Sequence, residues 1–206
     1  MTDKNKCEHT LCGRFLTELG HEIINIMTPL EHFEYLEEEM IAARVARGER
    51  LGKQLGKIAR YISHDTTGEP YEFSEFIYDL KDKCRDLGIS ASIENKNYQS
   101  IDTMKGRNII LTVLDEILMN WKMHGKNEFA INIADERTIV FKNDYDPSFL
   151  KNIGKTKEEL SRPFVKRSSA QGSGLGLYVI ELASREGGFS WNLSADEKYF
   201  SLSLSF

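Results

Sequence analysis

The sequence predicts an α+β protein in which an antiparallel helical hairpin precedes a two-layer α/β sandwich. In the first part of the chain, apolar residues recur every three or four positions, which is typical of helices. In the second part, helical periodicity alternates with short stretches of strand-like alternation. Between them, the stretch TTGEP at residues 66–70 combines Gly and Pro and predicts a linker. We therefore expect two domains, residues 1–66 and 67–206.

Composition excludes several classes of protein. The chain has 206 residues, of which 40% are hydrophobic, enough to bury a core. Its 27 basic and 32 acidic residues give a net charge of −5, without the basic excess of a nucleic-acid-binding surface. No apolar run approaches the roughly 18 residues of a membrane-spanning helix, and the N-terminus lacks a signal-peptide segment. We expect a cytoplasmic protein with no nucleic-acid partner and no membrane segment in this chain.

The first part carries a heptad-like apolar seam. This seam predicts one helix over residues 16–40, bent at Pro29, and a second helix over residues 51–62 after a turn at Gly48. Two helices with apolar stripes cannot enclose a core alone, so we expect the hairpin to dimerise as a four-helix bundle. The seam consists of Leu16, Leu19, Ile23, Ile26, Leu30, Phe33 and Met40, followed by Leu51, Leu55, Ile58 and Ile62.

The second part predicts helices packed on one face of a largely antiparallel sheet. Apolar residues at positions 200, 202, 204 and 206 alternate with serines, which is typical of a half-buried strand. This strand is expected to pair with the segment before it across a turn at residues 195–198. The expected helices span 74–87, 105–123 and about 174–187, and the expected strands span 89–94, 129–134, 138–142, 190–194 and 200–206.

One polar face of the first helix has a composition that suggests chemistry. His21 lies opposite the apolar seam, with Glu22 beside it and Asn25 one turn further along. An ordinary solvated helix face can carry such residues. An exposed imidazole beside a carboxylate can also act as a nucleophile, because the carboxylate can hold the ring tautomer and accept its proton.

The sequence around this histidine resembles a known motif. Residues 20–30, GHEIINIMTPL, resemble the phosphoacceptor box of sensor histidine kinases, in the variant with Asn four residues after the His and Thr-Pro seven and eight residues after it. The commoner variant has Pro five residues after the His. The resemblance implies that His21 is phosphorylated, that Glu22 is its acid/base partner, and that Asn25 helps to position the water that dephosphorylates the response regulator. It also implies a homodimer and a response-regulator receiver domain as partner.

A glycine-rich turn opens the last predicted helix. Residues 172–177 read GSGLGL. Glycines before a helix let backbone N–H groups approach phosphates, and the helix N-terminus favours anions. The turn does not directly follow a strand, which disfavours a dinucleotide-binding Rossmann turn. It resembles the second glycine box of the gyrase/MutL/histidine-kinase ATPase superfamily, and residues 162–169, RPFVKRSS, resemble the flexible lid of that superfamily. The nucleotide-binding residues implied are Lys166, Arg167, Gly172, Gly174, Leu175 and Gly176.

A third box lies on the helix expected over residues 105–123. Glu116 and Asn120 are four residues apart and share one face. An amphipathic helix alone accounts for this spacing, but beside the glycine turn it resembles the N-box of the same superfamily. The resemblance implies that ATP binds near Glu116 and Lys122, and that the Asn120 oxygen coordinates the Mg²⁺ that bridges the phosphates. Sparse oxygen ligation suits a cation that keeps several waters.

The chain departs from the family pattern at two places. After Asn120, the family has a small residue and then a Lys two positions on, where this chain has Trp121 and Met123. The first glycine box, Asp-x-Gly-x-Gly, is missing, and residues 143–147 read NDYDP instead. We expect Asn143, or else Asp144, to bind the adenine.

Two functions follow from these motifs. The first is a two-component histidine kinase that autophosphorylates His21 with ATP and Mg²⁺ and passes the phosphoryl group to a response-regulator aspartate. The alternative is a non-enzymatic phosphorelay module with a degenerate nucleotide site. The missing first glycine box favours the relay, whereas the glycine turn and the Glu116/Asn120 pair favour the kinase. An anti-sigma serine kinase of the same superfamily is disfavoured by the helix that carries His21.

Overall fold

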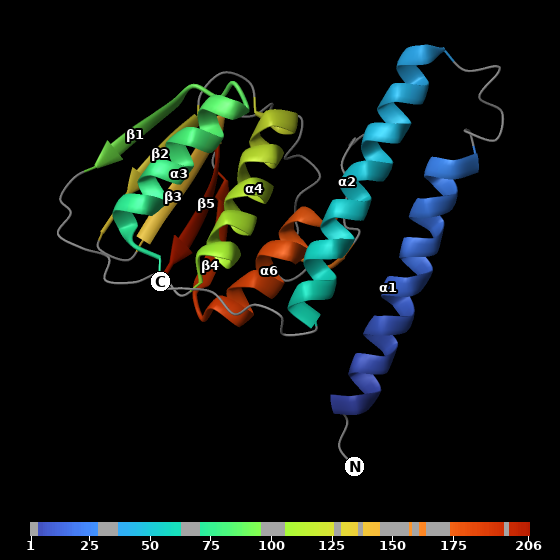
Figure 1. Cartoon of the computed structure of the whole chain (residues 1–206). Coiled ribbons are helices and arrows are strands. Elements are labelled where there is room, and N and C mark those ends of the chain that lie inside the picture. Colours follow the sequence, from blue (N-terminus) through green and yellow to red (C-terminus); the bar gives the residue numbers. More distant parts are fainter. Residues whose placement is uncertain are drawn as a thin grey trace.

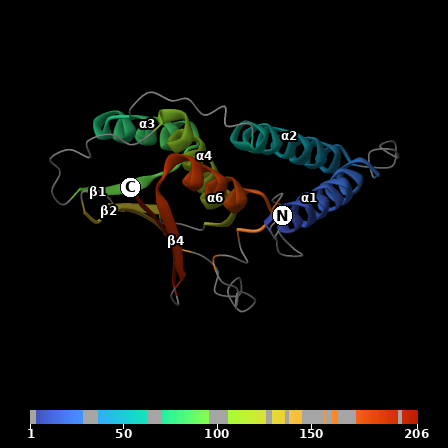
Figure 2. The same cartoon turned by 90° about the horizontal axis from the view of Figure 1, so that it is seen from below.

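The structure is α+β, as the sequence predicts: a two-helix hairpin lies beside a five-stranded sheet that is covered on one face by three helices (Figures 1 and 2). In the part of the chain that the structure describes, no helix has the length and hydropathy needed to cross a membrane. The expected linker and the predicted residues Leu30, Phe33, Lys166, Arg167 and Gly172 lie outside that part. This computed structural model describes residues 4–28, 37–62, 71–95, 106–125, 129–135, 138–144, 157, 161–163, 174–195 and 198–206.

The boundaries of the hairpin differ from the predicted ones. Helix α1 spans Lys4–Met27 and helix α2 spans Glu38–Ile62, so the prediction of one helix to residue 40 and a turn at Gly48 was wrong. The first helix ends where it does because the residue before a proline, here Thr28, disfavours helical geometry. A glycine inside a helix costs only about 1 kcal/mol relative to alanine. Gly48 is such a glycine, and it faces Ile26 of α1.

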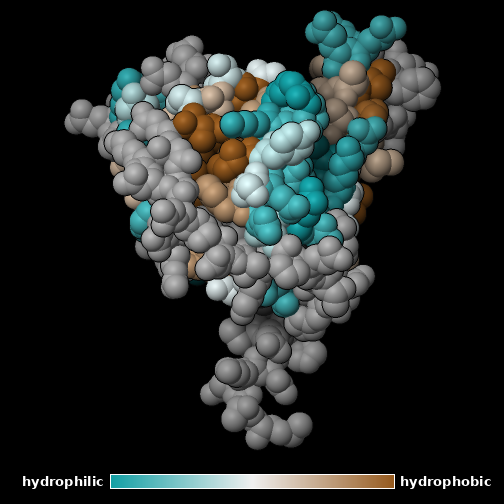
Figure 3. All heavy atoms as spheres, turned by 60° about the vertical axis from the view of Figure 1, so that its left-hand side comes forward, coloured by the Kyte–Doolittle hydropathy of each residue, from teal (hydrophilic) through white to brown (hydrophobic). Residues whose placement is uncertain are grey.

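The residues of the predicted apolar seam lie on two different faces of the hairpin, one buried and one exposed. Ile26 of α1 and, on α2, Leu51 and Ile58 are buried inside the molecule. Leu16 and Ile23, in contrast, are 59% and 45% exposed. Figure 3 shows hydrophobic atoms at the surface near the upper end of the hairpin. The exposed large apolar residues of the two helices are Leu16, Ile23, Ile24, Met27, Met40 and Val45.

The second part forms the predicted helices-on-sheet sandwich. The order of the strands is β1-β2-β3-β5-β4; β1 and β2 are parallel and all other neighbours are antiparallel. The pairing of the last two strands confirms the prediction from serine alternation. Helices α3 (Phe73–Asp86), α4 (Arg107–His124) and α6 (Gly176–Gly187) cover the sheet of β1 (Ala91–Asn95), β2 (Phe129–Ile133), β3 (Thr138–Asp144), β4 (Ser190–Ala195) and β5 (Tyr199–Ser205).

The core lies between these helices and the inner face of the sheet. Helix α4 supplies much of it, because six apolar residues on one broad face are buried. From β5, Leu202 and Leu204 point into the same core, as the alternation predicts. Helix α6 ends at Gly188, whose φ of 67° is left-handed and whose N–H donates to the Ser184 carbonyl. Glycine closes helices in this way because it lacks a Cβ. Separately, the shared core holds α4 and α6 side by side.

The buried thiol of Cys84 on α3 provides a test of how α3 packs on the core. Burial raises the pKa of its thiol to about 11, so the thiol stays protonated at pH 8. Because the thiolate is the reactive form, a Cys7→Ser/Cys12→Ser variant should react with a thiol reagent roughly 100-fold more slowly when folded than in urea. The measurement is the labelling rate with and without denaturant; rapid labelling of the folded protein would contradict the packing of α3.

Candidate functional site

The start of α6 meets the polar face of α4. A Cβ placed on Gly176 would lie 3.2 Å from Glu116 Oε2 and 3.3 Å from Asn120 Nδ2. Only glycine therefore allows this approach without a shift of its neighbours. Just before it, Gly174 has a φ of 76°, a left-handed value that also favours glycine. The structure thus brings together two of the boxes that the sequence predicts.

Leu175, which the sequence analysis placed among the nucleotide-binding residues, is fully buried. Its side chain anchors the glycine turn in the core, so only its backbone can face a ligand. Lys122 is exposed on α4.

The Glu116 carboxylate is held by α2. Its side chain is only 7% exposed; Lys57 Nζ lies 2.9 Å from Oε1, and Gln54 Nε2 donates to Oε2 at 2.7 Å. Lys57 also lies 3.7 Å from the neighbouring Asp115, which is paired with Lys83 of α3. A buried carboxylate requires such partners, because desolvation of an unpaired charge is costly. Sequence reasoning missed Gln54 and Lys57, since nothing distinguishes them from other polar residues of α2.

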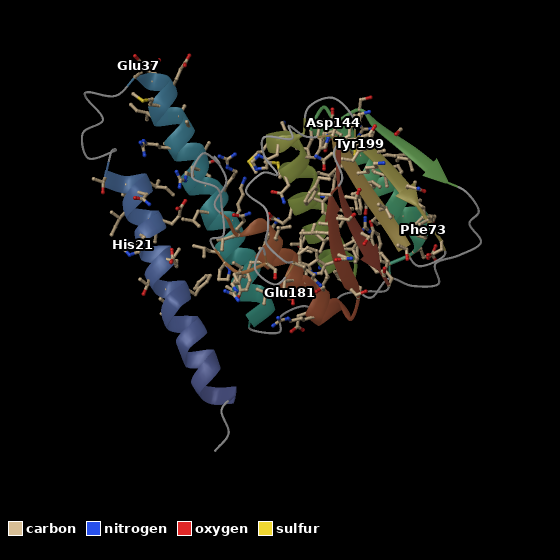
Figure 4. The ribbon with its side chains drawn as sticks, turned by 180° about the vertical axis from the view of Figure 1, so that it is seen from behind. His21, Glu37, Phe73, Asp144, Glu181 and Tyr199 are labelled. Carbon is tan, nitrogen blue, oxygen red and sulfur yellow. The ribbon has the colours of Figure 1, made fainter. Side chains whose placement is uncertain are left out.

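The expected adenine-binding residues lie at the end of β3. Asn143 is paired with Phe129 of β2, whose ring centroid is 5.3 Å from that of Trp121 on α4. The last turns of α4 and the end of β3 are therefore close. Asn143 Nδ2 donates to the Asp144 carbonyl at 3.1 Å. Asp144 is buried and lies beside Tyr199 of β5 (Figure 4).

The residues of the expected phosphoacceptor box face different ways. His21 and Asn25 are exposed, and Figure 4 shows His21 on the side of α1 away from the α/β sandwich. Glu22 is 4% exposed and faces α2, where Arg47 Nε donates to its Oε1 at 2.9 Å. One turn away, Arg44 Nη1 donates to the Asn25 carbonyl at 3.0 Å. Sequence reasoning missed both arginines.

The side chains at this site fit a sparsely ligated Mg²⁺. In the described part of the chain, no group of three His, Cys, Asp or Glu residues could hold a metal ion. The Asn120 carboxamide, in contrast, lies against the glycine turn. One amide oxygen beside a glycine turn suits a cation that would take its other ligands from phosphate and water.

These features define a class of fold, a helical hairpin followed by an α/β sandwich, and solved histidine kinases have a similar fold. The structure is similar to the histidine kinase AdeS of Acinetobacter baumannii, at a TM-score of 0.62 and 15% sequence identity over 92% of this chain and 96% of that chain. It is also similar to full-length ShkA, solved in complex with AMPPNP, at a TM-score of 0.54 and 12% identity over 96% of this chain and 46% of that chain.

Another similar structure is a bacterial phosphotransferase. The alignment covers 100% of this chain and 98% of that chain at 14% identity, but its TM-score of 0.43 is too low to carry any conclusion. No family model and no curated protein matches the sequence. At such low identities, these likenesses show the fold.

The contact between α2 and α4 can be tested by substitution. Lys57→Met leaves the buried Glu116 carboxylate without its cation and should lower the free energy of unfolding by about 3 kcal/mol. Adding Glu116→Gln should recover part of that loss, because it removes the uncompensated charge. The measurement is urea unfolding followed by tryptophan fluorescence, with Lys53→Met on the exposed side of α2 as the matched control. Equal stability of the Lys57 and Lys53 variants would contradict the pairing.

Proposed function

We propose that this protein is the core of a two-component histidine kinase, which transfers the γ-phosphoryl group of ATP to His21. One observation carries the proposal: Gly176 brings the glycine turn against Glu116 and Asn120, in a chain whose hairpin exposes a histidine. The fold shared with AdeS and ShkA supports it. We assign phosphotransfer and dimerisation to residues 1–66 and nucleotide binding to residues 67–206.

In this proposal, each residue has a role in positioning or proton transfer. The imidazole of His21 attacks the γ-phosphorus, so that an N–P bond forms, the P–O bond to the β-phosphate breaks and ADP leaves. Glu22 takes the proton from the other ring nitrogen, which requires its carboxylate to turn away from Arg47. Asn143 or Asp144 holds the adenine. Asn120 holds Mg²⁺, which neutralises charge on the phosphates when bound.

The nucleotide site and His21 must come closer together for this transfer. Helix α2 lies between α1 and α4 in Figures 1 and 4, and His21 is on the far side of α1. Transfer therefore requires either movement of the hairpin relative to the sandwich or the histidine of a second copy. The phosphoryl group then passes to an aspartate of a response-regulator receiver domain, which can reach His21 and Asn25 on the exposed face of α1.

A phosphorelay module is the second candidate. The contact of Glu116 with Gln54 and Lys57 favours it, because α2 occupies a carboxylate that the kinase reading assigns to the nucleotide site. The absence of the first glycine box after β3 agrees with this reading. A relay would use only the exposed face of α1, accepting phosphate on His21 from one regulator and passing it to another.

Labelling with ATP separates the two functions. In a kinase, the wild type incubated with labelled ATP and Mg²⁺ should acquire acid-labile, base-stable phosphate, and His21→Ala should remove it. Asn120→Asp should also remove it, because it changes the metal ligand, yet this variant should still take phosphate back from a phosphorylated regulator.

A relay would be labelled by the phosphorylated regulator alone, in the wild type as well as in Asn120→Asp. Persistence of label in His21→Ala would show that the nucleophile is another residue. Labelling by neither donor, over a range of regulators, would count against both functions.

The exposed apolar stripe on α1 predicts a dimer. Ile23 is 45% exposed, whereas Ile26, less than one turn away, is 5% exposed against α2. Ile23→Glu should therefore give a monomer with unchanged helix content, because a charge buried between two hairpins is costly. Ile26→Glu should instead unfold the hairpin itself. Sedimentation and circular dichroism at tens of micromolar check both variants, and a monomeric wild type would contradict the four-helix bundle.

A further inference from the structure

Helix α2 packs mainly against α6, and its side chains reach the polar face of α4 at two places. At one end, Arg50 Nη1 lies 3.5 Å from Met123 Sδ. At the other end, Gln54 and Lys57 hold Glu116. Arg50 and Lys57 are separated by the same number of residues as Glu116 and Met123, a rise of about 10 Å along either helix. Asn120 therefore lies between the two contacts, with α2 on one flank and Gly176 on the other.

Arg50 differs from the other cations at this junction. Lys57 is paired with Glu116, Lys83 is paired with Asp115, and Arg47 is paired with Glu22. The guanidinium of Arg50 is partly buried, and its contact among the described residues is a thioether sulfur, which is a weak acceptor. No carboxylate in the described part of the chain forms an ion pair with it. A half-buried guanidinium without an anion is incomplete, because its planar donors suit carboxylate or phosphate oxygens.

Among the described residues, the lysines near Arg50 on α2 and α3 that face α4 are already paired with carboxylates. The α4 face presents Glu116, Asn120 and Met123, and Lys122 next to them is exposed on a different side of the helix. Because Lys57 and Lys83 are paired with the two carboxylates, Arg50 is a positive charge of this junction that no described carboxylate neutralises. It contacts Met123, which lies one helical turn along α4 from the amide that we assign to Mg²⁺.

We propose that Arg50 binds the phosphate tail of the nucleotide, so that the site is built from both parts of the chain. In this arrangement, α4, β3 and the glycine turn hold the nucleotide, and α2 supplies a phosphate-binding cation. The pairing of Gln54 and Lys57 with Glu116 keeps α2 in the position where Arg50 can reach the phosphates. The inference rests on the proposed kinase function and adds a binding residue to it. It also explains how the site can have methionine at position 123, where the family pattern has lysine, because Arg50 supplies a positive charge next to it.

The test compares ligands that differ in the number of phosphates. The full chain is titrated calorimetrically with adenosine, ADP and a non-hydrolysable ATP analogue, each with Mg²⁺, for wild type, Arg50→Ala and Arg50→Lys. The matched control is Lys53→Ala, one turn along α2 on its exposed side. Unchanged thermal unfolding midpoints establish that the variants are folded.

We expect Arg50→Ala to weaken the ATP analogue by roughly 10- to 100-fold, as for loss of a charge-assisted hydrogen bond, and to leave adenosine unchanged. Arg50→Lys should lose less, because it keeps the charge without the planar fork. Lys53→Ala should match the wild type. The loss for the ATP analogue should shrink at high salt, since added ions screen a partly exposed charge.

Four outcomes would overturn the inference. Unchanged affinity in Arg50→Ala would show that Arg50 does not touch the phosphates, while the kinase proposal would stand. Increased affinity would show that α2 covers the site and competes with the nucleotide. Equal weakening for adenosine and the ATP analogue would indicate a structural effect. A wild type that binds none of the three ligands would overturn the kinase proposal as well. Failure of the Arg50 inference alone therefore differs from failure of the kinase proposal, because in the first case the wild type still binds nucleotide.

Discussion

The ion pair between Lys57 and Glu116 is the interaction on which the arrangement of the two parts depends. A carboxylate that is only 7% exposed must find a cation, and α4 has none on that face. The cation comes from α2, and Gln54 satisfies the second oxygen. Once these contacts form, the hairpin is no longer an independent rod beside a sandwich. Its second helix packs against α6 and reaches the polar face of α4 next to the start of α6.

The first helix depends on α2 in the same way. Arg47 draws the Glu22 carboxylate into the interior of the hairpin, while His21 and Asn25 stay on the outer face. Helix α2 therefore binds one carboxylate at each of the two sites that the proposed reaction needs, Glu22 beside His21 and Glu116 beside Asn120. A change in the position of α2 would alter both environments together. A movement of the hairpin would thus be felt directly at the Glu116 side chain of α4.

Local patterns predicted most of the fold, because they depend on short-range physics. Alternation with serine identified β5, and glycine after an apolar helix identified the end of α6. The predicted boundaries of the hairpin helices were wrong. The apolar period of the sequence continues between α1 and α2, so the pattern alone could not place the end of α1. Gly48 was taken for that turn, although a single glycine inside a long helix is tolerated.

The candidate site was predictable only in part, for a different reason. Glu116, Asn120 and Gly176 carry motifs that can be compared with known ones, and the structure brings them together. Lys57 and Arg50 carry none, because a charged residue on an amphipathic helix looks the same whether it meets water or another helix. The strand order has one more consequence. β5, the last strand of the chain, lies between β3 and β4. During synthesis the sheet therefore cannot close until β5 has left the ribosome, whereas the hairpin precedes every strand and can fold before any of them pair.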